Sequence, residues 1–67
     1  MKIFCERLKE LIEEKGLSAN QLAKELNTHH SSILRWESGE RVPSIDNLYM
    51  LAVYFNVSAD YLLGLED

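Results

Sequence analysis

Apolar residues recur at helical spacing along the whole chain, and residues that end helices interrupt them at short intervals. Four apolar residues at positions i, i+4, i+7 and i+8 predict one face of a first helix, namely Phe4, Leu8, Leu11 and Ile12. Gly16 follows and is suited to end that helix. No stretch alternates apolar and polar residues as a half-buried strand would. The pattern therefore predicts an all-α fold.

Four more helices are predicted by the same spacing and by capping residues between them. Serine favours the N-cap, and asparagine can adopt the left-handed conformation that closes a helix. The expected N-caps are Ser18, Ser44 and Ser58, and the expected closing residues are Asn27 and Asn56. We expect a third helix to begin near His29 or His30 and to end at Gly39. The expected inward faces are, in chain order, Leu22, Ala23 and Leu26; Ile33, Trp36 and Glu37; and Ile45, Leu48, Leu51, Ala52 and Phe55. The short fifth helix is expected to carry Tyr61, Leu62 and Leu65.

The length and composition exclude several classes of protein. With 67 residues the chain is long enough for one domain, and we expect residues 1–67 to form it. The single Cys5 can form neither an internal disulfide nor a cysteine-rich metal site, which favours a reducing, cytoplasmic location. No apolar run is long enough to span a membrane. No nucleophile–base–acid set, phosphate loop or metal site is visible, so we expect neither an enzyme nor a cofactor.

The negative charge is confined to the end of the chain. The formal net charge is −4, which argues against a general binder of polyanions. Residues 1–17 and 18–43 are each neutral in formal charge, whereas residues 44–67 contain no basic residue. The acids of that last segment are Asp46, Asp60, Glu66 and Asp67. A polyanion could therefore approach the middle of the chain, with the final third turned away.

The segment from about residue 18 to residue 39 has the features of a helix-turn-helix. Ala23 is small enough to let two helices cross closely, and Asn27 can form the turn between them. Ile33 and Trp36 would hold the second helix on the core. The opposite face of that helix would then be free to enter the major groove of DNA.

The sequence resembles the Cro/repressor-type, or XRE, family of helix-turn-helix domains over nearly its whole length. The matching residues are Arg7-Leu8-Lys9-Glu10-Leu11, Lys15-Gly16-Leu17-Ser18, Gln21-Leu22-Ala23, Leu26, Ser31-Ser32-Ile33, Arg35-Trp36-Glu37-Ser38-Gly39, Arg41, Pro43-Ser44, Leu48, Leu51-Ala52 and Val57-Ser58-Ala59-Asp60-Tyr61-Leu62-Leu63-Gly64. The resemblance implies a five-helix, lambda-repressor-like fold. It also implies binding of double-stranded DNA, usually as a symmetric dimer on a palindromic operator.

The resemblance assigns candidate contacts residue by residue. The family positions that contact bases fall on His30, Ser31 and Arg35, with Leu34 adjacent, and a usual phosphate contact falls on Ser32. The N-terminal end of the second helix, with Ser18, would present free N–H groups to a phosphate. Arg41, in the loop before the fourth helix, is the expected cation on the DNA backbone.

The sequence departs from the family pattern at several positions. Ala19 stands where a glutamine is typical, and Glu40 where a lysine is common. Ile12 replaces the usual basic partner of a buried acid, represented here by Glu37. We expect Glu37 to bind backbone N–H groups or a cation such as Arg7 or Arg41 instead, or else to stay solvated. The departures predict weaker non-specific binding to DNA than is usual in the family.

Several residues admit two interpretations. Arg35 could read a guanine or simply pair with Glu37 or Glu40 in solvent. Leu34 could contact a thymine methyl group or belong to a protein-binding patch. A further group could be scattered exposed residues or a dimer interface, namely Tyr49, Met50, Val53, Leu63 and Leu65. A metal site at His29 and His30 is disfavoured because adjacent histidines on a helix point in different directions.

We therefore expect a cytoplasmic, DNA-binding transcriptional regulator, a repressor that acts as a homodimer. No small-molecule effector domain is visible in the sequence. The alternative is a protein–protein interaction module on the same fold, such as an antitoxin-like adaptor with weak affinity for DNA.

Overall fold

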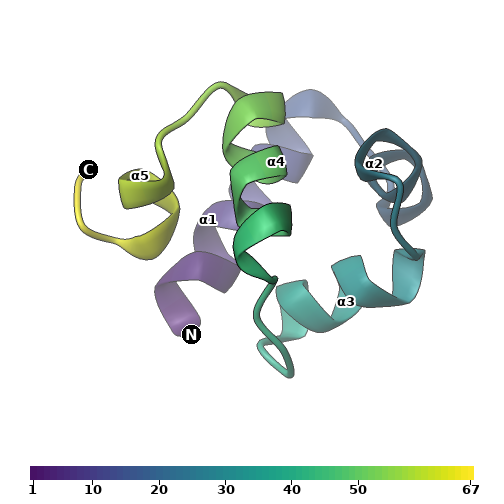
Figure 1. The fold of residues 1–67 in the computed structure, drawn as a ribbon, viewed down its shortest axis with the longest axis horizontal. Helices are drawn as coiled ribbons and strands as arrows, with labels where there is room; N and C mark the ends of the chain where they lie inside the picture. Colours follow the sequence, from purple (N-terminus) through teal and green to yellow (C-terminus); the bar gives the residue numbers. More distant parts are fainter.

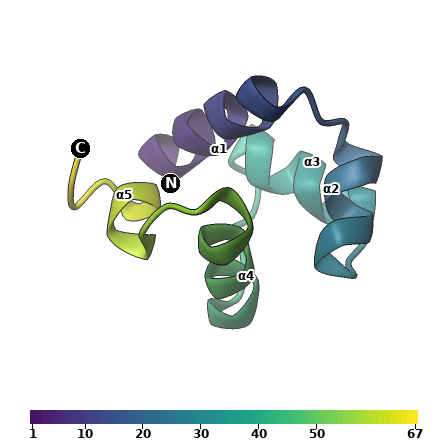
Figure 2. The same ribbon diagram turned by 90° about the horizontal axis from the view of Figure 1, so that it is seen from above.

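Five helices follow one another in the computed structural model, which describes all 67 residues. They are α1 (Lys2–Lys15), α2 (Ala19–Leu26), α3 (His30–Ser38), α4 (Ile45–Phe55) and α5 (Ala59–Leu63). There are no strands, which confirms the all-α, five-helix prediction. The molecule measures 28 × 23 × 22 Å. The short α5 and the C-terminus lie at one end of the long axis and α2 at the other (Figures 1 and 2).

The helix ends lie where the capping residues predict. Ser18, Ser44 and Ser58 each accept a hydrogen bond from the backbone N–H three residues later. A cap of this kind stabilises a helix by about 1 kcal/mol. Asn27 and Asn56 adopt the left-handed conformation, with φ angles of 54° and 55°, and close α2 and α4. Side-chain caps thus fix where α2, α4 and α5 begin, whereas α1 and α3 begin at Met1 and His29 without a side-chain capping hydrogen bond.

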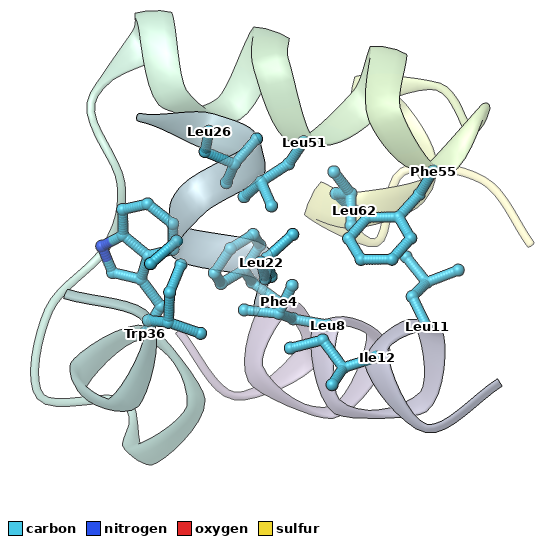
Figure 3. Packing of buried hydrophobic residues seen from close by; sticks show 12 residues of the cluster. Phe4, Leu8, Leu11, Ile12, Leu22, Leu26, Trp36, Leu51, Phe55 and Leu62 are labelled. Carbon is cyan, nitrogen blue, oxygen red and sulfur yellow. The ribbon is translucent and has the colours of Figure 1, made fainter. Parts of the chain in front are cut away.

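All helices except α5 contribute at least two residues to one apolar core, and α5 contributes Leu62 (Figure 3). The core residues are Phe4, Leu8, Leu11, Ile12, Leu22, Ala23, Leu26, Ile33, Trp36, Leu51, Phe55 and Leu62. Trp36 is buried among them, as the sequence predicts. Cys5 is also buried, beside this cluster. No charged or polar side chain is buried with them, so the stability of the fold rests on apolar packing.

One residue expected in the core lies on the surface instead, and one expected on the fifth helix lies beyond it. Ile45 is 81% exposed, because it is the first residue of α4 and no other element covers it. Leu65, which we expected on the fifth helix, lies beyond α5, which Gly64 closes in a left-handed conformation, and its side chain is exposed. Leu48 and Ala52, from the same predicted stripe as Ile45, are partly buried against the core. No helix is long and apolar enough to cross a membrane.

Candidate nucleic-acid interface

The helices α2 and α3 form a closely packed pair joined by a tight turn. Ala23 and Ile33 are buried where the two helices pack. Asn27 turns the chain, and the backbone N–H of Thr28 donates to the carbonyl of Ala23 at 2.9 Å. Figure 2 shows the two helices side by side at one end of the molecule. This arrangement is a helix-turn-helix, with α3 in the position of the helix that enters a groove.

One side of α3 is buried and the other faces solvent. Ile33 and Trp36 point into the core, which fixes the rotation of the helix about its axis. The side chains of His30, Leu34 and Arg35 are exposed, and those of Ser31 and Ser32 are half-buried. The structure therefore places the four predicted base-contacting residues and Ser32 on the accessible part of α3. Their contacts with bases and phosphate remain predictions.

The predicted phosphate contacts flank α3. Ser18 begins α2 in a capping box, in which its hydroxyl accepts from the N–H of Gln21 and the Gln21 side chain accepts from the N–H of Ser18. The capping box leaves the N–H groups of Ala19 and Asn20 without a partner inside the helix. Arg41, in the loop after α3, is exposed and forms no ion pair. Free N–H groups and a free cation suit contact with phosphate.

Arg35 is held by a turn that folds back over the end of α3. Its Nε lies 3.4 Å from Oε2 of Glu40, the ion pair that the sequence offered as one of two interpretations. Its carbonyl accepts hydrogen bonds from the hydroxyl of Ser38 and from the backbone N–H of Arg41. Both side chains of the pair remain more than half exposed. The guanidinium is thus positioned but still accessible.

The comparison with known families agrees with this geometry. Residues 8–62 match the family model described as helix-turn-helix, which spans α2, α3 and most of the rest of the chain. The chain belongs to this helix-turn-helix family. The resemblance to Cro/repressor-type domains is thereby confirmed.

Relatives of this helix-turn-helix chain are named as transcriptional regulators. The uncharacterized HTH-type transcriptional regulator YobD of Bacillus subtilis (strain 168) is 37% identical over 97% of this chain and 58% of its own length. The HTH-type transcriptional activator BcrR of Enterococcus faecalis is 36% identical over 96% of this chain and 31% of its own length. The chain thus spans about a third to three fifths of these two curated relatives.

A crystal structure of a transcriptional regulator from Listeria innocua has the same fold. It superposes with a TM-score of 0.88 at 39% identity, covering 96% of this chain and 60% of that one.

Glu37 has none of the partners that the sequence offered it. It is half-buried and forms neither a hydrogen bond nor an ion pair, so the expected partner in Arg7, Arg41 or the backbone was wrong and the solvated alternative fits the structure. Glu37 instead lines a polar depression of about 430 Å³ between α1 and α3, together with Lys2 and Lys9. Solvent reaches the carboxylate there, so it needs no buried partner.

Arg7 does not line that depression, because its side chain binds the backbone near the C-terminal end of the chain. Its guanidinium donates to the backbone carbonyls of Tyr61 and Glu66 and lies 4.4 Å from the centre of the Tyr61 ring. The carboxylate of Glu66 in turn accepts a hydrogen bond from the Ser58 hydroxyl. Sequence reasoning missed this connection because the partners lie 54 and 59 residues apart along the chain.

A second exposed surface, which we call the α4 face, lies on the outer side of α4. Ile45, Tyr49 and Val53 succeed one another at intervals of four residues and are 81%, 66% and 61% exposed. They border a shallow groove of about 620 Å³ that also reaches Val57 and Ala59. Exposed apolar residues gathered in one groove suggest a contact surface for a protein.

Proposed function

We propose that this helix-turn-helix chain is a cytoplasmic, sequence-specific DNA-binding regulator of transcription. The observation that carries the proposal is the outward face of α3, where Arg35 stands more than half exposed on a helix that Ile33 and Trp36 hold rigidly. A rigid helix with exposed side chains is what direct reading of a major groove requires. The relatives, which are named as transcriptional regulators, support the same function.

The proposed contacts follow from the position of each side chain. His30, Ser31, Leu34 and Arg35 would face the base edges, with Arg35 suited to O6 and N7 of a guanine. Phosphates would be bound on either side of α3, by Ser32, by the N-terminal end of α2 at Ser18 and by Arg41. In this proposal residues 1–67 act as one DNA-binding domain.

We propose further that the protein represses transcription as a homodimer on a palindromic operator. One α3 covers only a few base pairs, so two copies related by a two-fold axis would read two half-sites about 34 Å apart. The α4 face supplies an apolar surface for the second copy. A dimer bound across a promoter can block access without any further activity, which is why repression is favoured over activation.

Selection of bound duplexes from a random DNA pool tests the proposal. The expected result is an enriched motif with two inverted half-sites centred about ten base pairs apart. The matched control is the double variant Ser31→Ala, Arg35→Ala, which removes a half-buried hydroxyl and an exposed guanidinium and should enrich no motif. Absence of enrichment by the unmodified protein would contradict the proposal.

The α4 face and Leu34 also support the second candidate function, an adaptor that binds protein. Leu34 is 50% exposed on α3, where a polar residue would suit DNA better. An adaptor should show almost no binding to duplex DNA even at low salt, so the same selection would separate the two functions.

A further inference from the structure

The turn after α3 brings Glu40 back toward Arg35. The Ser38 hydroxyl donates to the carbonyl of Arg35 at 3.1 Å and accepts from the N–H of Glu40 at 3.3 Å. Gly39, between them, has a φ of 84°, a conformation that side chains disfavour. A Cβ added at Gly39 would also lie 3.3 Å from Sγ of the buried Cys5. The turn therefore holds the backbone of Glu40 close to Arg35, within reach of an ion pair between the two side chains.

The ion pair uses only one edge of the guanidinium. Oε2 of Glu40 lies 3.4 Å from Nε of Arg35, and the two terminal nitrogens of Arg35 have no partner in the molecule. This is the only ion pair of the structure. Terminal nitrogens that stay free while Nε is held can still donate to the paired acceptors of a guanine.

We infer that Glu40 is a specificity-determining residue that positions Arg35 and neutralises its charge away from the correct site. The inference rests on the proposed function, since it concerns how Arg35 discriminates between DNA sequences. A free arginine at the protein surface binds any phosphate, which strengthens binding to all sequences alike. The carboxylate of Glu40 repels phosphate and satisfies the guanidinium when no guanine is in reach. This arrangement weakens non-specific binding and raises the ratio of specific to non-specific affinity.

A double-mutant cycle at Arg35 and Glu40 tests the inference. The four proteins are the unmodified chain, Arg35→Ala, Glu40→Gln and the double variant, each titrated with the best selected duplex and with a scrambled duplex. For Glu40→Gln we expect about threefold tighter binding to the scrambled duplex, a small change on the selected duplex and a salt slope steeper by about one. In the Arg35→Ala background, Glu40→Gln should leave the ratio of the two affinities unchanged.

Glu37→Gln is the matched control, because it removes the same charge from the same helix end without touching Arg35. It should leave the ratio of specific to non-specific affinity unchanged. The inference is overturned if Glu40→Gln changes both affinities equally, or if its effect is the same with and without Arg35, since either result shows only a general effect of charge. If the unmodified protein binds neither duplex, the proposed function itself fails and the inference with it.

Discussion

Arg35 is the residue on which the proposed reading of DNA depends most. Its backbone carbonyl is hydrogen-bonded in the turn after α3 and its guanidinium is exposed, so its substitution should affect recognition without affecting the fold. Arg35→Ala should cost about 1–3 kcal/mol of binding free energy on the selected duplex and relax the preference at one base position. Titration of duplexes with single base changes would measure this. An equal loss on every duplex would reassign Arg35 to the phosphates.

Glu37 gives a second test at the scale of one residue, this time of stability. Its carboxylate is half-buried, unpaired and reached by solvent, so removing the charge should change little. We expect the free energy of unfolding of Glu37→Gln to lie within about 0.5 kcal/mol of that of the unmodified chain. Urea denaturation at neutral pH is the measurement. A loss above about 1 kcal/mol would mean that Glu37 pairs with a neighbouring lysine in solution.

Among the helices, α5 is the one whose position depends most on a single contact with a residue distant in the sequence. It has five residues and contributes Leu62 to the core, while Arg7 of α1 binds its backbone and stacks on Tyr61. Arg7→Ala should lower the free energy of unfolding by about 1–3 kcal/mol, because two hydrogen bonds to a charged donor and a cation–π contact are lost. Lys9→Ala, an exposed change on the same helix, is the control and should have almost no effect. Equal urea midpoints for the two variants would show that Arg7 does not secure α5.

The elements also show which features of the fold could be predicted from the sequence. Most helix ends depend on a cap a few residues away, as at Ser18 and Asn27, so short-range patterns predict most of the helix boundaries. The exposure of Ile45 could not be predicted in this way, because its spacing fits the buried stripe and only the packed structure shows that nothing covers it. The candidate site could likewise be predicted from the sequence only in part. The outward direction of Arg35 follows from helical spacing, whereas its choice of Glu40 over Glu37 depends on the hydrogen-bonded turn at Ser38.

At the scale of the whole molecule, the α4 face and the distribution of charge bear on dimerisation. Residues 44–67 carry every excess negative charge, so two copies that meet through the α4 face repel one another. We therefore expect a monomer–dimer equilibrium at micromolar concentrations that raised salt or palindromic DNA shifts toward the dimer. Sedimentation with and without a palindromic duplex measures this.

A variant of the α4 face makes the dimer prediction specific. Tyr49→Asp places a charge on the exposed apolar stripe and should leave only monomer. In the absence of DNA, Asn20→Asp adds the same charge on an exposed position of α2 and should leave the monomer–dimer equilibrium nearly unchanged. A chain that stays monomeric at every concentration, and binds DNA equally well when one half-site is scrambled, would contradict the dimer.

The most direct test of DNA recognition by this molecule is the salt dependence of its binding to duplex DNA. The affinity of the full chain for the selected duplex would be followed by fluorescence anisotropy between about 50 and 200 mM salt. We expect log K to fall steeply and linearly with log salt concentration, and Arg41→Ala to reduce that slope by about one, because one phosphate contact is lost. A flat salt dependence would show that the proposed phosphate contacts do not form, and no binding at the lowest salt would contradict DNA binding by this molecule.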